Sequence, residues 1–173
     1  MVEIYLTKLL KEYGLSYFYP LFMKDYLKIK KKLMEACFLF VEERMNTVTH
    51  SIESNKKALF SETKSSAGDK HETGRAMLQL EMEKAGQQLS SIDQMKEIMK
   101  KVTVESTSGV VCLGSLVITD KGNYYLAISM GKIDIESIDY YAVSTNSPIG
   151  SQLLGKGEGD SISFNNAIIL KII

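Results

Sequence analysis

The chain has 173 residues, and its 21 basic and 21 acidic side chains balance to a net charge of zero, which gives no general argument for binding nucleic acid or a membrane surface. Two cysteines, Cys37 and Cys112, and two histidines, His50 and His71, provide neither a zinc-ligand spacing nor a disulfide framework. Without a membrane-length apolar run or a signal-peptide pattern, we expect a cytoplasmic protein with no membrane partner.

Residues 1–22 form an aromatic-rich N-terminal extension that differs in composition from the rest of the chain. Apolar residues between Val2 and Tyr13 could line one face of a short helix that ends at Gly14, and Pro20 then interrupts the pattern. Two interpretations stay open: a small helix packed on the base of the next element, or upstream sequence before a natural start at Met23.

Residues 23–100 carry the pattern of two long helices. The first, 23–64, contains no Pro or Gly, and the second runs from about Asp69 to Met99 or Lys100. In both, seam residues recur with alternating spacings of four and three, which is typical of a coiled coil. The seam residues are Met34, Phe38, Val41, Met45, Val48, Ile52, Asn55 and Leu59 in the first helix, and Leu78, Met82, Ala85, Leu89, Ile92, Lys96 and Met99 in the second.

The short polar connection between these helices predicts an antiparallel hairpin whose tip is residues 60–77. If the seam residues nearest the tip face each other, Val48 lies opposite Leu89 and Met45 opposite Ile92. The same register places the turn between Gly68 and Asp69, about 50 Å from Met34 at about 1.5 Å per helical residue. It also sets Glu62 opposite Arg75 as an expected ion pair.

A cluster of lysines marks the base of the first helix, at Lys28, Lys30, Lys31 and Lys32. One interpretation is a solvated helix face. The other is a contact with phosphate or with an acidic protein.

Residues 101–173 change to a strand-like period and predict a small antiparallel sheet with one short helix. Residues 109–119 and 124–130 form a hairpin around the turn at 120–123, and a third strand covers Tyr140 to Ser144. Ser147 and Pro148 are a natural N-cap and first residue of a short helix that ends at Gly155. Strands at 161–164 and from Ala167 to the end come next, joined by a tight Asn-Asn turn, so the chain is predicted to be α+β.

Asp69 and Glu72 are the candidate functional residues of the tip. Their spacing satisfies a helix capping box, in which Asp69 is the N-cap and Glu72 reaches back to it, and spacing alone favours this structural role. Because a capping carboxylate keeps free lone pairs, a second role is compatible with the first. Ser147 and Pro148 are expected to be structural, because no His or acid lies at a spacing that would activate a serine nucleophile.

The order of helical hairpin and small sheet domain resembles the bacterial Gre transcript-cleavage factors, GreA and GreB. Their C-terminal hallmark is matched by residues of the segment NSPIGSQLLGKGEGD: Ser147, Pro148, Ile149, Leu154, Gly155, Lys156, Gly159 and Asp160. The resemblance covers roughly residues 30–173. It implies a C-terminal domain of FKBP-like fold over 101–173, behind a coiled-coil hairpin over 23–100.

The tip resembles the family motif Gly-Asp-x-x-Glu-Asn through Gly68, Asp69, Glu72 and Thr73. By this resemblance the hairpin enters the secondary channel of RNA polymerase, and Asp69 and Glu72 help to hold a second Mg²⁺ near the 3′ end of the nascent RNA. Backtracked RNA is then cleaved by the polymerase. The resemblance therefore implies a monomeric accessory factor rather than an enzyme in its own right, with no cofactor of its own and a Mg²⁺ that it shares with the polymerase.

Three residues of the tip depart from the family pattern. Thr73 and Gly74 replace Asn and Ala, and Arg75 replaces an acid, so the negative charge of the tip is diluted. Two alternatives arise from this: a regulator or inhibitor that binds in the same channel without promoting cleavage, and a coiled-coil interaction module whose tip is only a helix cap. An exposed apolar face on the hairpin would favour the interaction module.

Overall fold

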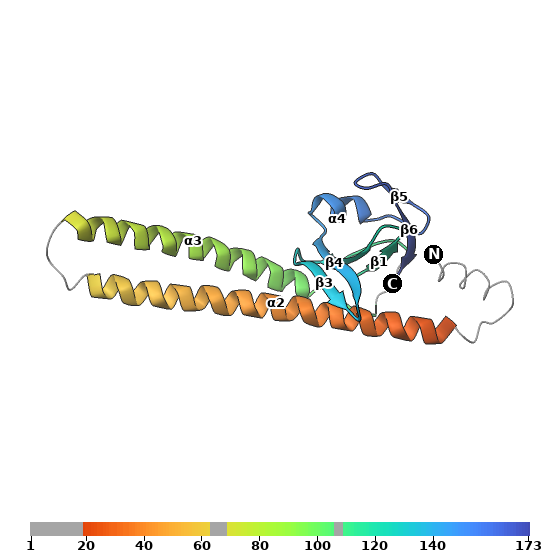
Figure 1. The fold of residues 1–173 in the computed structure, drawn as a ribbon, viewed down its shortest axis with the longest axis horizontal. Helices are drawn as coiled ribbons and strands as arrows, with labels where there is room; N and C mark the ends of the chain where they lie inside the picture. Colours follow the sequence, from red (N-terminus) through yellow and green to blue (C-terminus); the bar gives the residue numbers. More distant parts are fainter. Residues whose placement is uncertain (1–18, 63–68, 106–108) are drawn as a thin grey trace. The chain divides into compact units, whose positions relative to one another are not determined.

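The structure is a computed structural model that describes residues 19–62, 69–105 and 109–173, with backbone alone at 19–24, 62 and 69–72 (Figure 1). Its residues fall into two compact units. The hairpin unit comprises residues 39–97, and the sheet unit joins residues 98–173 to the N-terminal part of the chain up to residue 38. The expected boundaries at 22 and 100 differ from this division, in which the lower part of the first helix belongs with the sheet.

Two long helices occupy the first half of the chain, α2 at Tyr19–Glu62 and α3 at Asp69–Met99. The predicted bounds of α3 are confirmed. The helix α2 begins earlier than the predicted start at residue 23, and Pro20 lies in its first turn. The pattern that Pro20 was expected to interrupt lies in residues 1–18, outside the described residues. Proline fits the first turn of a helix because the amide hydrogen that it lacks would have no intrahelical acceptor there.

Within the hairpin unit, the predicted seam is the buried stripe of both helices. Val41, Val48, Ala85 and Ile92 are each at most 7% exposed. The remaining seam residues between 45 and 96 are half-buried. Apolar burial along this stripe stabilises the pair of helices.

The seam does not extend to the part of α2 that precedes residue 39, and the prediction that Phe38 is a buried seam residue is wrong. Phe38 is 41% exposed, whereas Leu33 and Cys37 are fully buried. The physical reason is that this part of α2 packs in the sheet unit, and the buried positions there lie one residue earlier along the helix.

The sheet unit contains six strands and the short helix α4. The strand order is β3-β4-β2-β1-β6-β5. The strands are β1 Leu116–Thr119, β2 Asn123–Ala127, β3 Gly131–Ile135, β4 Ile138–Ser144, β5 Ser161–Ile162 and β6 Ala167–Ile172, and α4 is Pro148–Leu153. Together with the helical hairpin, this arrangement confirms the predicted α+β class.

The sheet is mixed, which corrects the expectation of a wholly antiparallel sheet. Strand β4 pairs with β2 in parallel, with Tyr125 opposite Ala142, and with β3 in antiparallel register. The cause is the strand β3, which was not predicted. After β2 the chain turns at Gly131, which has φ +94°, and forms β3 at the edge of the sheet. It then reverses into β4, which lies between β3 and β2. The alternation of apolar Ile133 and Ile135 with polar neighbours was the available sequence signal.

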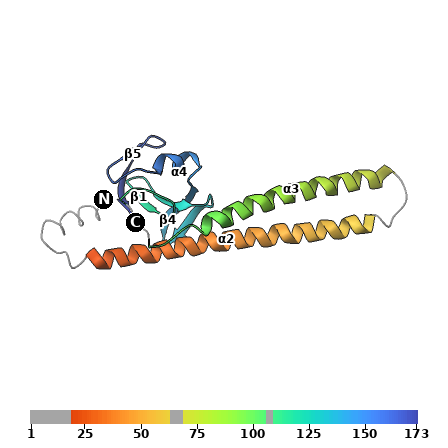
Figure 2. The same cartoon turned by 180° about the vertical axis from the view of Figure 1, so that it is seen from behind.

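The two faces of the central strands are buried by different elements. On one face, Val117, Leu126 and Ile169 form a core with Leu153 of α4. On the other, Tyr125 is fully buried, and this burial raises the pKa of its hydroxyl, with a smaller contribution from Cys37 of α2. Figures 1 and 2 show the lower part of α2 beside the sheet from opposite sides. The sheet unit is therefore a layered core closed by a helix from the other end of the sequence.

No helix in the described ranges is long and apolar enough to cross a membrane.

Glycine is required at one position of α4. A Cβ atom built on Gly150 would overlap the carbonyl oxygen of Ser144 and lie 2.9 Å from the Ser147 hydroxyl. By contrast, a Cβ on Gly157 meets nothing closer than 3.8 Å. The close approach of α4 to the end of β4 therefore depends on the missing side chain.

We predict that Gly150→Ala lowers the free energy of unfolding by about 2 kcal/mol, because the backbone must move to relieve the overlap. Urea denaturation of the whole chain measures this, and Gly157→Ala is the control that should change stability by less than about 0.5 kcal/mol. An equal or higher stability for Gly150→Ala would contradict the close packing of α4 on the end of β4.

We also predict that Cys37 resists alkylation in the folded protein. Burial raises the pKa of the Cys37 thiol to about 12 from its ordinary 9.0, whereas Cys112 is half-buried. Thiolates are the reactive form, so at pH 8 iodoacetamide should label Cys37 at least tenfold more slowly than Cys112. Because the folded pKa is the higher one, this contribution to stability is present below pH 9 and is lost as the pH rises toward 12. Equal labelling rates without denaturant would show that α2 does not cover the sheet.

Candidate functional site at the hairpin tip

The two predicted tip acids lie in the first turn of α3. Asp69 is the first residue of that helix and Glu72 comes three positions later. Positions i and i+3 share one helix face, with Cβ atoms about 5–6 Å apart. The positive end of the helix dipole favours ionised carboxylates at this end. The backbone therefore places two acidic residues together where α3 begins.

The surroundings of these acids are only partly described. Residues 63–68, including Gly68, lie outside the described residues, as do the side chains of residues 62–72. The expected capping box and the expected pair between Glu62 and Arg75 therefore stay predictions. Thr73 and Arg75 are exposed, and Arg75 lies three positions after Glu72. A basic residue on the same face lowers the net negative charge of this end of the helix.

Among the side chains that the structure describes, no group of three or more His, Cys, Asp or Glu residues could hold a metal ion. Asp69 and Glu72 would supply two hard oxygen ligands, whereas Mg²⁺ takes six in an octahedral arrangement. The remaining ligands would come from water and a partner. These residues thus suit a shared Mg²⁺ and are too few for an all-protein site.

The first residues of the hallmark segment, residues 147–160 of the sheet unit, have structural roles. The Ser147 hydroxyl accepts a hydrogen bond from the Gly150 amide at 3.1 Å and donates one to the Ser144 carbonyl at 2.7 Å. Pro148 occupies the first turn of α4, as predicted. With its hydroxyl used as an N-cap, Ser147 has the structural role expected of it.

The end of the same segment forms a hydrogen-bonded turn. Gly155 at φ +78° donates its amide to the Val111 carbonyl at 2.8 Å, and Gly159 at φ +90° donates to the Ile169 carbonyl at 2.8 Å. The Asp160 carboxylate accepts the Gly157 amide at 2.8 Å. These residues join α4 to β6 and to the segment before β1. The hallmark therefore describes how this unit is built.

The four lysines of the basic cluster near the start of α2 have different surroundings in the structure. Lys30 is fully buried, and this burial lowers its pKa, although the nearby Cys112 has the opposite effect. Lys32 binds Glu136 at 2.6 Å, and this contact lowers the pKa of the Glu136 carboxyl. Lys28 lies 3.8 Å from Asp25. A single solvated or phosphate-binding face over all four lysines is therefore wrong.

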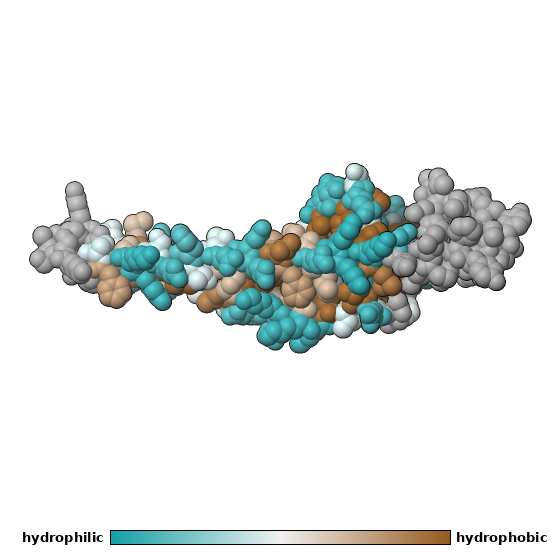
Figure 3. Space-filling model, turned by 90° about the horizontal axis from the view of Figure 1, so that it is seen from below, coloured by the Kyte–Doolittle hydropathy of each residue, from teal (hydrophilic) through white to brown (hydrophobic). Residues whose placement is uncertain are grey.

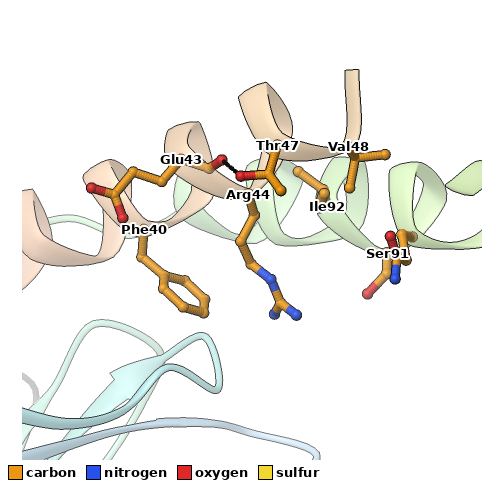
Figure 4. A pocket seen from close by; sticks show the side chains of 8 residues that line it. Phe40, Glu43, Arg44, Thr47, Val48, Ser91 and Ile92 are labelled. Atoms are coloured by element: carbon orange, nitrogen blue, oxygen red, sulfur yellow. Dashed lines mark hydrogen bonds between the residues drawn. The ribbon is translucent and has the colours of Figure 1, made fainter. Parts of the chain in front are cut away.

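Two surface features of the hairpin unit were not predicted. One is a groove of about 350 Å³ lined by Phe40, Glu43, Arg44, Thr47, Val48, Gln88, Ser91 and Ile92 (Figure 4). Val48 of α2 and Ile92 of α3 both line it, and the predicted pairs of Val48 with Leu89 and of Met45 with Ile92 stay predictions. The other is a set of exposed apolar side chains at Leu39, Phe60, Met77 and Leu80. Figure 3 shows one face of the molecule, on which apolar residues interrupt the polar covering of the helices. The sequence signal for the groove was the pair Phe40 and Arg44, which are four positions apart and lie outside the seam.

Comparisons with known proteins add little to this picture. No family model and no curated protein matches the chain. A solved structure described as that of the transcription factor Gfh1 is similar at 16% sequence identity and a TM-score of 0.29, over 80% of this chain and 92% of that one. A similarity this low supports no argument about function. The function is therefore argued from the residues of the candidate site.

Proposed function

We propose that this chain is a Gre-type transcription factor that binds RNA polymerase through the secondary channel and stimulates cleavage of backtracked RNA. The observation that carries the proposal is the placement of Asp69 and Glu72 in the first turn of α3, the second helix of the hairpin. The hallmark segment 147–160 in the same chain supports it, through its resemblance to the Gre factors.

The proposed role of the tip rests on the chemistry of its ligands. Asp69 and Glu72 would hold a Mg²⁺ together with the polymerase, near the 3′ end of the nascent RNA. When bound, such an ion activates water and stabilises the leaving oxygen in a two-metal arrangement. Two carboxylates at a helix start lack the enclosed, pre-organised pocket that catalysis requires. The chain is therefore proposed to be an accessory factor rather than an enzyme, with no cofactor of its own.

The sheet unit is proposed to be the docking module. Among the described residues from 98 to 173, six large apolar side chains are more than a third exposed, which is a usual feature of an interaction surface when they adjoin. They are Val110, Ile138, Tyr141, Leu154, Phe164 and Ile168. A contact made here would hold the factor while the tip acts elsewhere.

We predict that Asp69→Ala combined with Glu72→Ala abolishes cleavage stimulation and leaves polymerase binding within twofold of the parent chain. The reason is that both Mg²⁺ ligands are lost while the docking surface is kept. The measurement is shortening of RNA in stalled, backtracked elongation complexes with Mg²⁺ present. The control is Asp69→Asn with Glu72→Gln, which keeps size and polarity but removes the charge and should also be inactive. Cleavage that persists in the double alanine variant would refute the role of the tip.

The diluted charge of the tip supports a related alternative, a polymerase-binding regulator without cleavage activity. The exposed Arg75 lies on the same helix face as Glu72 and would compete with a metal ion for its carboxylate. In the same assay, this alternative gives polymerase binding without RNA shortening by the parent chain.

A second candidate function is a self-associating coiled-coil module, which the exposed apolar residues of the hairpin unit favour. Met77 and Leu80 are 63% and 52% exposed and share one face of α3, and Phe60 of α2 is 73% exposed. Exposed large apolar groups of this kind are a usual feature of protein interfaces.

We predict that the parent chain is monomeric in sedimentation equilibrium at concentrations up to about 100 times those used for polymerase binding. The interaction module instead requires a dimer that Met77→Lys with Leu80→Lys dissociates, because two charges would have to be buried at its interface. Gln79→Lys, on a neighbouring exposed position, is the control for added charge. A dimer with that response would replace the proposed monomer.

A further inference from the structure

The groove of the hairpin unit has an apolar floor between the two helices and a polar rim. Val48 and Ile92 form the floor and are 7% and 2% exposed. Arg44, Gln88 and Ser91 stand at the rim and are exposed. Figure 4 shows that Phe40, Arg44 and Ser91 project to the same side of the helix pair. A ligand that entered here would meet apolar surface and hydrogen-bond donors together.

Arg44 is held in place by an aromatic ring. Its guanidinium carbon lies 5.1 Å from the centre of the Phe40 ring, one helical turn earlier on α2. Among the side chains that the structure describes, Arg44 forms no ion pair with an acidic residue. The Glu43 carboxylate beside it points away along the helix (Figure 4). Stacking on a ring leaves the edge of a guanidinium, with its parallel N–H donors, open for a second contact.

The donors around the groove define the chemistry of what fits it. A guanidinium edge binds a carboxylate with two parallel hydrogen bonds. The Gln88 amide and the Ser91 hydroxyl line the opposite wall and can add further hydrogen bonds. The Thr47 hydroxyl already donates to the Glu43 carbonyl at 2.8 Å. The complementary group is therefore a carboxylate beside an apolar side chain that covers Val48 and Ile92.

The openness of the groove points to a protein rather than a small molecule. Small-molecule sites enclose most of the surface of their ligand, whereas five side chains of this rim are exposed to solvent: Glu43, Arg44, Thr47, Gln88 and Ser91. The groove runs along α2 from Phe40 to Val48, which is about 12 Å at about 1.5 Å per residue. This length fits two turns of a partner helix that presents one acidic and one apolar side chain.

We propose that this groove is a docking site for an acidic, amphipathic helix of the partner protein, with Arg44 as its anchor. In the context of the proposed function that partner is RNA polymerase, and this assignment rests on the proposed function. The site is separate from the tip acids: Arg44 precedes the last residue of α2 by 18 positions. It would give the hairpin an affinity of its own that does not depend on the tip.

The test compares Arg44→Glu with Lys57→Glu in binding to core RNA polymerase, with the full chain in every case. Lys57 is exposed, lies 13 positions further along α2, and is absent from the groove lining. We expect Arg44→Glu to weaken binding at least tenfold and Lys57→Glu to change it less than twofold. Arg44→Lys keeps the charge but loses the paired donors, so it should give an intermediate loss. Equal affinities for the parent chain and Arg44→Glu would overturn the inference while leaving the proposed function intact.

A second arm needs no polymerase. Two helical peptides are titrated into the ¹⁵N-labelled chain, one with a Leu–Glu pair four positions apart and one with Gln in place of the Glu. Saturable shifts of the Arg44 side-chain N–H signals with the first peptide, absent with the second and in Arg44→Met, support the docking site. If polymerase binds no form of the chain, the proposed function fails and this titration alone decides the inference. No shift with either peptide, or a dimer that Arg44→Glu dissociates, overturns it.

Discussion

The packing of a single helix into two different cores is the constraint on which the structure depends. Leu33 and Cys37 of α2 are buried in the sheet unit, whereas Val41 and Val48 are buried in the hairpin unit. A helix of 44 residues is stable in water chiefly through such apolar burial rather than through its intrinsic propensity. The sheet unit therefore includes a segment that precedes its strands by more than 70 residues. A fragment beginning at residue 101 would expose the face of Tyr125.

The residues that build the sheet unit differ from those proposed to bind a partner. The hallmark segment around α4 is occupied by capping, turn and backbone hydrogen bonds, and Ser147 and Asp160 both serve backbone amides. The buried Lys30 and the bound Lys32 belong to the contact between α2 and the sheet. The groups proposed to bind a partner lie outside these contacts. In the proposed function these are the tip acids, the exposed apolar residues and the Arg44 groove.

Much of the fold could be predicted from the sequence because its signals are local. The seam spacing predicted both helices, and Ser147 with Pro148 predicted the start of α4. The Asn-Asn turn before β6 lies where expected, with Asn166 at φ +53°. The parallel pairing of β2 with β4 is non-local and leaves no periodic signal. The shift from Phe38 to Cys37 likewise depends on which unit α2 faces. The tip acids were located by motif and spacing, whereas the groove arises from residues of two helices that meet only after folding.

The paired seams of α2 and α3 restrict how this hairpin can change in length. Val48 of α2 and Ile92 of α3 line one groove between the helices, so an insertion in one arm alone would shift every contact of the two seams beyond it. Lengths that keep the stripe in phase differ by seven residues in each arm, which moves the loop end by about 10 Å at about 1.5 Å per residue. The reach of the tip can therefore vary only in steps, and each step preserves the direction in which the start of α3 faces relative to the seam.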